Sequence, residues 1–238
     1  LSGELMKVVI VAKTRMRRGA CIGALTFDGC SLRLIAADHE TNEQFNQDYQ
    51  VGDVWEIDAI EDHEIIPPHI ENVIVLKKQY LAPISGIVEL IEAQMPPVCG
   101  GVDLLFDGLT QAQKTGARFI VRRPGLPEFS TMFWRPDKNL VRDEDQKRIR
   151  YRYPGKDGGS TLTFVGFQEP LPEIPAGTLV RVSLAHWWRP KEKPEAELRC
   201  YLQISGWFLE TDSLPVQKEE PEKDHFQGHG DRIPEIRR

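Results

Sequence analysis

The stretch KVVIVAK, residues 7–13, decides the fold class of this chain. Its four central residues, Val8 to Val11, are all β-branched, and such side chains fit the pleated surface of a strand better than a helix. Short runs of similar character follow it, separated by turn signals such as Asp28-Gly29. With the first stretch they make five short strands in about 80 residues: Lys7–Lys13, Ala20–Phe27, Ser31–Ala36, Gln50–Asp58 and Glu71–Lys78. This spacing is typical of a small barrel or sandwich.

The first strand is apolar on both faces. Alternate residues of a strand point to opposite sides, so Val8 and Ile10 share one face and Val9 and Val11 share the other. Both faces therefore need cover. Residues 83–95 carry apolar side chains at helical spacing, and Pro96-Pro97 ends the run. We predict that this helix covers the outer face of the first strand.

The second half of the chain repeats the strand pattern. Six further strands are predicted there: Ala117–Arg122, Glu128–Trp134, Ile149–Tyr153, Thr161–Phe167, Thr178–Leu184 and Leu198–Phe208. From about Leu214 onward the chain is almost without apolar residues, so it cannot bury enough surface to offset chain entropy. The prediction is a mainly β protein with two small β-barrels joined by a helical segment; one continuous β-sandwich is the alternative. The boundaries are 1–82 for the first barrel, 83–113 for the helical connector, 114–209 for the second barrel and 210–238 for a disordered polar tail.

Composition excludes several classes of protein. The 238 residues are 40% hydrophobic and 28% charged, which is ordinary for a globular chain. No apolar run approaches the roughly 20 residues that a membrane helix needs, and the first residues do not resemble a signal peptide. The four cysteines, at positions 21, 30, 99 and 200, lack zinc-binding spacing. We expect a cytoplasmic protein with reduced thiols.

Charge is divided unevenly along the chain. Residues 1–113 carry 8 basic and 17 acidic side chains, whereas residues 114–209 carry 17 basic and 11 acidic ones. The net charge of −6 therefore hides a basic second half. Such a half is either an ordinary solvated surface or the electrostatic footprint of a polyanion, most often nucleic acid.

Motifs for catalysis are missing from the sequence. There is no phosphate-binding Gly-rich loop ending in Lys-Ser/Thr, no Gly-x-Ser-x-Gly and no His-Glu-x-x-His. Paired carboxylates lie in charge-rich, loop-like runs where solvation is the usual outcome. We therefore expect no catalytic residue, no metal and no cofactor, although an enzyme of unfamiliar type stays a third possibility.

Aromatic residues interleaved with arginine are the positive evidence for function. Aromatic faces stack on unpaired bases while Arg and Lys follow the phosphates, so single-strand binders combine the two. A basic turn after the first strand adds charge. The candidate nucleic-acid-binding residues are Lys13, Arg15, Arg17, Arg18, Trp134, Arg135, Arg150, Arg152, Trp187, Trp188 and Arg189.

Each aromatic candidate also has a structural interpretation, in which its ring belongs to the core. Arg150 and Arg152 alternate with Tyr151 and Tyr153, so arginines and tyrosines point to opposite faces of a strand. Trp187 and Trp188 are adjacent, so in an extended segment one of them is expected to be exposed. The two interpretations of Trp134 are evenly balanced.

Many short segments together resemble the dual OB-containing domain family of prokaryotes. The matching segments are Val9–Arg15, Gly19–Gly23, Arg33-Leu34, Val51–Glu56, Pro67–Glu71, Phe133–Pro136, Val165–Phe167, Arg181–Ala185, Trp187–Arg189 and Arg199–Trp207. They span roughly residues 7–209. The resemblance implies two OB-type barrels and a nucleic-acid-related role, beside helicases or nucleases in anti-phage or DNA-processing gene clusters. It supplies no functional residues.

The leading hypothesis is a non-enzymatic nucleic-acid-binding module that prefers single-stranded DNA or RNA and serves a DNA-processing or anti-phage defence complex. The alternative is a protein–protein adaptor that docks a partner helicase or nuclease without touching nucleic acid. The acidic first half favours a protein partner for the first barrel.

Overall fold

The structure is a computed structural model of the chain. It describes residues 3–16, 19–36, 46–143 and 148–209. The polar tail predicted over 210–238 and the candidate residues Arg17 and Arg18 lie outside the described residues. Within the described part, no helix is long and apolar enough to cross a membrane.

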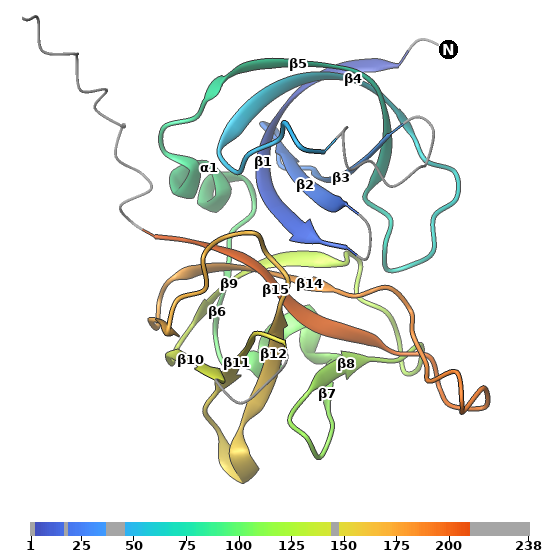
Figure 1. The fold of residues 1–238 in the computed structure, drawn as a ribbon, viewed down its shortest axis with the longest axis vertical. Helices are drawn as coiled ribbons and strands as arrows, with labels where there is room; N and C mark the ends of the chain where they lie inside the picture. Colours follow the sequence, from blue (N-terminus) through green and yellow to red (C-terminus); the bar gives the residue numbers. More distant parts are fainter. Residues whose placement is uncertain (1–2, 17–18, 37–45, 144–147, 210–238) are drawn as a thin grey trace, which may run out of the picture.

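The first five strands close into a barrel (Figure 1). The strands are β1 (Glu4–Arg15), β2 (Ala20–Thr26), β3 (Ser31–Ala36), β4 (Asp53–Glu61) and β5 (Asn72–Pro83), in the order β1-β2-β3-β5-β4. Only the β3–β5 pairing is parallel. Closure gives every strand two neighbours, so the barrel has no open edge. The five strands predicted from the sequence are all present.

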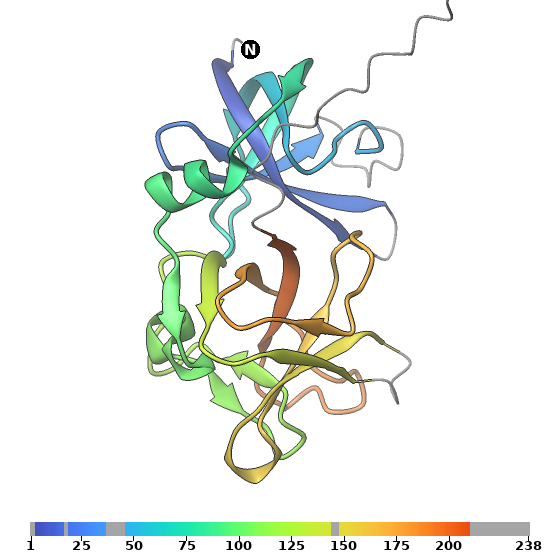
Figure 2. The ribbon, with the colours of Figure 1, turned by 90° about the vertical axis from the view of Figure 1, so that its left-hand side faces the viewer.

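β1 packs against two different cores. Val8 and Ile10 point into the barrel with Trp55 and Ile57. Val9 and Val11 point outward to helix α1 (Ile87–Gln94), where the shared cluster is Val9, Val11, Leu25, Ile87, Val88, Ile91, Phe133, Leu179 and Phe208. The predicted helical cover of the outer face is confirmed. The cluster also contains three residues of the second half, so α1 lies in an apolar core that both halves share (Figure 2).

The second half forms a ten-stranded sheet. The strand order along its main path is β13-β10-β11-β12-β15-β14-β9-β6. Off this path, β8 pairs with β15 and with β7. The bounds are β6 (Val98–Gly100), β7 (Gln111–Ala112), β8 (Arg118–Ile120), β9 (Thr131–Pro136), β10 (Leu140–Asp143), β11 (Arg150–Tyr153), β12 (Ser160–Phe164), β13 (Glu173–Ile174), β14 (Leu179–Leu184) and β15 (Cys200–Phe208). The six predicted strands are all present, whereas β6, β7, β10 and β13 were not predicted.

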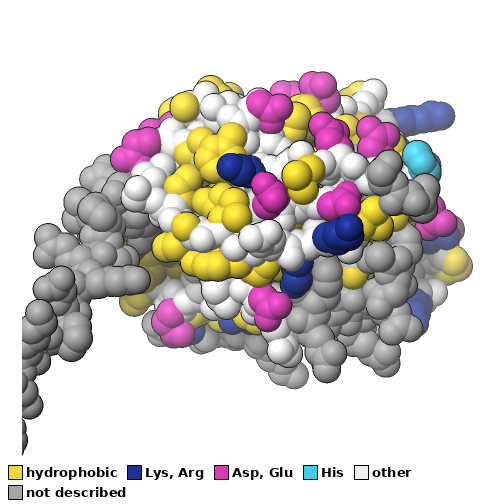
Figure 3. All heavy atoms as spheres, turned by 90° about the horizontal axis from the view of Figure 1, so that it is seen from above, with side chains coloured by type: hydrophobic (Ala, Val, Ile, Leu, Met, Phe, Trp, Pro, Cys, Tyr) yellow, Lys and Arg dark blue, Asp and Glu magenta, His cyan; other side chains and the backbone are white. Residues whose placement is uncertain are grey.

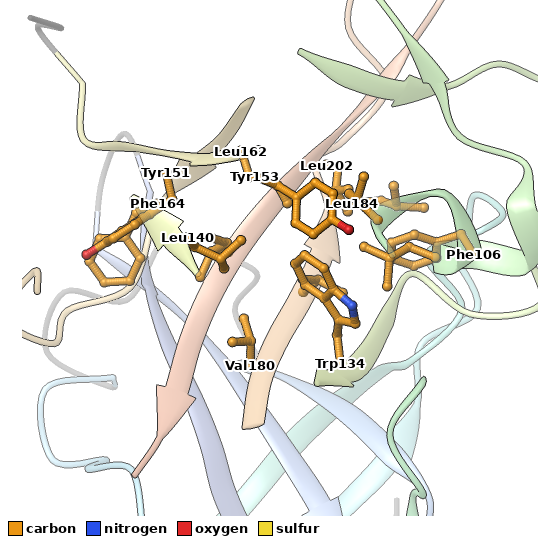
Figure 4. Close-up of a cluster of buried hydrophobic side chains, with 14 of the residues drawn as sticks. Phe106, Trp134, Leu140, Tyr151, Tyr153, Leu162, Phe164, Val180, Leu184 and Leu202 are labelled. Carbon is orange, nitrogen blue, oxygen red and sulfur yellow. The ribbon is translucent and has the colours of Figure 1, made fainter. Parts of the chain in front are cut away.

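The strands of this sheet contribute side chains to an aromatic-rich hydrophobic core (Figure 4). Trp134 is fully buried and its ring centroid lies 5.8 Å from that of Tyr153. Tyr151 meets Phe164 and Trp207 edge-on at 6.1 and 5.9 Å. Each of these rings removes a large apolar area from water, so they dominate the stability of this half.

The mainly β fold is confirmed, but the arrangement of two barrels joined by a helix is confirmed only for the first barrel. Pairing among the described residues leaves the second sheet open between β13 and β6. Residues 83–113, predicted as a helical connector, contain α1 and the short 3-10 segment Val102–Gly108, but also β6, which pairs with β9. The strand β6 escaped prediction because three residues are too short to show a period.

The two halves also meet through a polar seam. The end of β1 pairs with the segment after β12: Arg15 N–H donates to Val165 O at 2.7 Å, and Phe167 N–H donates to Lys13 O at 3.1 Å. On the other side of the seam, the His69 ring nitrogen Nε2 lies 3.1 Å from Leu184 O. These contacts hold the barrel against the sheet.

Candidate nucleic-acid interface

Lys13 and Arg15 lie together at the seam, around the ring of Phe167. The Lys13 ammonium is 5.6 Å and the Arg15 guanidinium 5.1 Å from the ring centroid of Phe167, which is 46% exposed. Arg15 also donates to Gly166 O. Its side chain is exposed and therefore available to an anion.

Lys13 serves the barrel itself. Its Nζ donates to Gln47 O at 3.0 Å and to Tyr49 O at 2.9 Å. Desolvation by burial lowers the Lys13 pKa, although the carboxylates of Asp48 and Asp53 oppose this shift. Because two carbonyls already accept from two of its three N–H donors, Lys13 has only one donor left for a phosphate.

The prediction that Trp134 stacks on a base is wrong. The side chain has no exposed surface, and its Nε1–H donates to Gly100 O at 2.9 Å. The neighbouring Arg135 is occupied as well: its guanidinium bonds to Glu92 of α1 at 2.7–2.8 Å and donates to Gly177 O. Trp134 is therefore a core residue, and Arg135 ties α1 to β9.

The alternation of arginine and tyrosine along β11 is confirmed. Tyr151 and Tyr153 are buried in the core, while Arg152 is exposed and Arg150 half-buried. Arg152 lies 3.4 Å from Asp143 on β10. The Arg152 side chain is 55% exposed although that of Asp143 is only 14% exposed, so the guanidinium can still meet a phosphate from the solvent side. The tyrosines cannot stack on bases.

Trp187 and Trp188 lie on the long loop between β14 and β15, which projects beside β8 (Figure 1). The expectation that one of them is exposed is confirmed, because Trp188 is 53% exposed. Its ring meets Tyr201 edge-on at 6.0 Å, and its backbone pairs with Arg199 in both directions at 2.9 Å. Trp187 packs partly against the core and donates from Nε1 to Pro67 O at 2.8 Å. Arg189 is exposed.

Arginines from distant parts of the sequence join these tryptophans. The Arg122 guanidinium lies 5.3 Å from the Trp187 ring centroid, and the Arg199 guanidinium lies 4.2 Å from that of Phe119. Neither arginine was predicted: Arg122 is far from the tryptophans in sequence, and Arg199, at the end of the same loop, stands apart from the Trp187-Trp188-Arg189 cluster. We call the set Arg122, Trp187, Trp188, Arg189, Arg199 and Tyr201 the aromatic–basic surface.

The candidate residues therefore form separate groups. Lys13 and Arg15 are at the seam, Trp187, Trp188 and Arg189 belong to the aromatic–basic surface, and Arg150 and Arg152 lie on β11. Trp134 and Arg135 belong to none of these groups, since one is buried and the other is bonded to α1.

The described residues contain no cluster of three or more His, Cys, Asp or Glu that could hold a metal ion. The four cysteines are free, and burial raises the pKa of the Cys200 thiol to about 12. That thiol stays protonated and inert near neutral pH.

Comparison with solved structures gives low-identity matches over most of the chain. A "Structure of murine DNA binding protein bound with ds DNA" has 10% identity and a TM-score of 0.29, covering 84% of this chain and 92% of the other. A "Crystal structure of p204 HINb domain" has 12% identity and a TM-score of 0.33, with coverages of 85% and 97%. A third, described as "Structural mimicry for functional antagonism", has 10% identity and a TM-score of 0.36, with coverages of 87% and 94%. These scores are too low to carry an argument.

The family comparison is decisive. No curated protein matches the sequence. The model of the dual OB-containing domain matches residues 6–207, which include the barrel, α1 and nearly all of the second sheet. The chain belongs to the dual OB-containing domain family.

Proposed function

We propose that this chain is a non-enzymatic nucleic-acid-binding module with a preference for single strands. One observation carries the proposal: Trp188, 53% exposed, lies on a surface with Arg189 and Arg199. An exposed indole stacks on an unpaired base and contributes about 1–3 kcal/mol of binding free energy. Bases inside a duplex are already stacked, which favours a single strand as the ligand.

Arginines on this surface supply the phosphate contacts. The Arg122 guanidinium lies over Trp187, and Arg189 projects into solvent next to Trp188. A guanidinium binds phosphate oxygens through two parallel hydrogen bonds while its face remains stacked on an aromatic ring. The exposed Arg152, on β11, is a candidate for a strand that continues beyond the loop.

Fluorescence anisotropy of a labelled oligonucleotide across a salt series tests the proposal, with DNA and RNA in parallel. Trp188→Ala should weaken binding by about 1–3 kcal/mol and leave the salt slope unchanged. Arg122→Ala should lower the slope of log affinity against log salt by about 0.7. Phe129→Ala, which removes an aromatic side chain that is 44% exposed elsewhere, is the matched control and should bind like the wild type.

Absence of binding to either nucleic acid at micromolar protein and low salt would refute the proposal. The double variant Arg150→Ala/Arg152→Ala adds a separate test: a flatter salt dependence would mean that the bound strand reaches β11. An unchanged slope would restrict the interface to the aromatic–basic surface.

A protein adaptor is the second candidate function. A groove of about 710 Å³ between the barrel and β9 is lined by Ile65, Ile70 and Phe129, which are 46%, 39% and 44% exposed. Exposed apolar side chains gathered in a groove are typical of protein-binding surfaces. Figure 3 shows hydrophobic side chains interspersed with Asp and Glu, and also with Lys and Arg, on the barrel face seen from above, and such a mixed surface suits a protein partner.

We place the module as a cytoplasmic accessory subunit, beside a helicase or nuclease, in a DNA-processing or anti-phage defence complex. Family resemblance supports this placement. Co-purification of the native protein with its neighbouring gene products tests it, and recovery of the chain alone would contradict it.

A further inference from the structure

A cavity of about 270 Å³ lies in the seam between the barrel and the second sheet. Both halves contribute side chains to its wall, among them Arg33 and Glu71 from the barrel side and Arg181 and His186 from the sheet side. Arg15 and His186 are exposed as well as part of the lining, so this end of the cavity opens to solvent. Its volume suits a small molecule or the end of a chain, not a folded partner.

Arg181 lies at the centre of the seam. Its neighbours on β14, Val180 and Val182, point into the core of the sheet, so Arg181 points the opposite way, toward the barrel. Gly23 of β2 leaves room for it: a Cβ at position 23 would lie only 2.8 Å from Arg181 Nη2. The absence of a side chain at Gly23 thus allows the guanidinium to pack against the barrel backbone.

The Arg181 side chain is almost fully buried, and no described residue accepts a hydrogen bond from it. The residue is 5% exposed, lines the cavity, and makes no hydrogen bond or ion pair with any described residue. Another buried arginine, Arg118, shows the usual arrangement: it pairs with Asp103 at 2.7 Å and donates to Thr110 and Ser160. The guanidinium donors of Arg181 are therefore free for what fills the cavity, either water or a ligand that supplies acceptors.

Charges around the cavity leave an excess of positive charge. Arg15, Arg33 and Arg181 face it, whereas Glu71 is the acidic residue of its lining. The Glu71 carboxylate already accepts hydrogen bonds from the backbone N–H and the hydroxyl of Ser130 at 2.6–2.9 Å. Glu71 still attracts Arg181 electrostatically, but its carboxylate makes no hydrogen bond or ion pair with Arg181 in the described part of the chain.

Two histidines at the cavity do not change its net charge. His69 and His186 stack with ring centroids 4.8 Å apart. Partial desolvation at the cavity wall, together with the positive charge of Arg33, lowers the pKa of both rings, so they are neutral at pH 7. The cavity thus has three positive charges and one negative charge, which matches a doubly charged anion.

We propose that this cavity binds a phosphate monoester, with the Arg181 guanidinium as its principal contact. A monoester has a charge near −2 at neutral pH, whereas the diester of an internal nucleotide has −1. The planar guanidinium suits two oxygens of one phosphate. The ligand is a free mononucleotide or the phosphorylated end of a strand, and both offer the same group. This site is separate from the aromatic–basic surface.

Isothermal titration calorimetry on the full chain tests the proposal. The probes are AMP, inorganic phosphate and adenosine at low ionic strength. AMP should bind and adenosine should not, because the recognised group is the phosphate. If neither AMP nor inorganic phosphate binds at millimolar concentration, and a 5′-phosphorylated oligonucleotide binds no better than its 5′-hydroxyl form, the proposal is wrong.

The two sources of the group are separated by competition. A 5′-phosphorylated oligonucleotide that displaces AMP, while its 5′-hydroxyl form does not, identifies a strand end as a ligand. Displacement by neither oligonucleotide identifies the free mononucleotide. Binding of AMP that survives Trp188→Ala supports this site even if single-strand binding by the surface fails, so the two proposals are tested independently.

Variants assign the binding to the cavity. Arg181→Met and Arg33→Gln should each weaken AMP binding by about tenfold or more, since a charge-assisted hydrogen bond contributes at least that factor. Arg142→Gln is the matched control: it removes a half-buried arginine of β10 that is not part of the cavity lining. If Arg181→Met does not fold, AMP binding by the Arg33→Gln variant alone tests whether the ligand binds in the cavity. Wild-type affinity in the folded cavity variants would overturn the assignment.

Discussion

Replacement of Arg181 by methionine should make the ligand-free protein more stable. The guanidinium is 5% exposed and has no hydrogen-bond or ion-pair partner among the described residues. Replacing buried ionic groups with apolar side chains of similar volume often stabilises a protein by about 1–4 kcal/mol. Attraction to Glu71 opposes part of this gain. We therefore expect about 1–2 kcal/mol, which for a chain of this size raises Tm by about 2–8 °C.

Arg118→Met is the matched comparison, because Arg118 is also buried, at 7% exposure. Its removal leaves the Thr110 and Ser160 acceptors in the interior without a donor. Each unsatisfied group costs about 1–3 kcal/mol, so the variant should lose about 2–4 kcal/mol. The salt bridge to Asp103 adds little, since that carboxylate is 82% exposed.

Urea denaturation followed by intrinsic fluorescence, with thermal melts in phosphate-free buffer, measures both variants. Opposite signs for the two substitutions would support our interpretation of Arg181 as a ligand group without its ligand. Equal destabilisation by both would refute it, because Arg181 would then have a structural partner in the folded protein.

Three further predictions concern packing, pH and the tail. Ile87→Asp and Ile10→Asp should each unfold the first barrel, because a buried unpaired charge costs several kcal/mol; a wild-type urea midpoint for Ile87→Asp would mean that α1 does not hold the outer face of β1. Partial desolvation at the cavity wall and the positive charge of Arg33 lower the pKa of His186 to about 4, so the unfolded chain binds its proton more readily. The stability contribution of His186 should therefore be complete above pH 6.5 and fall toward pH 4, and His186→Gln should reduce this slope relative to the wild type. Truncation after Ser213 should leave Tm unchanged, because the residues beyond it are almost without apolar side chains; a large loss of Tm would contradict this.

Local patterns in the sequence were sufficient to predict most of the elements. The continuous β-branched run of β1 and the alternation of Arg and Tyr along β11 each indicate a strand. Because successive side chains of a strand point to opposite sides, the residues on each face follow from the sequence. Helix α1 follows from apolar spacing ended by two prolines. The exposed Trp188 follows from two adjacent tryptophans that cannot share one face. In each case the information lies within about ten residues.

Only the tertiary structure shows which side chains each strand face contacts. The sequence places Trp134 beside Arg135 but does not show that Tyr153 and Gly100 bury the first and Glu92 binds the second. It also places Arg181 among β-branched residues of a strand, without showing that Gly23 lies opposite. Arg122 and Trp187 are 65 positions apart, yet their side chains are in contact. The alternation of residue types along one strand indicates which side chains share a face. Burial, ion pairing and the cavity depend instead on contacts between strands that are distant in sequence, and only the folded chain determines these contacts.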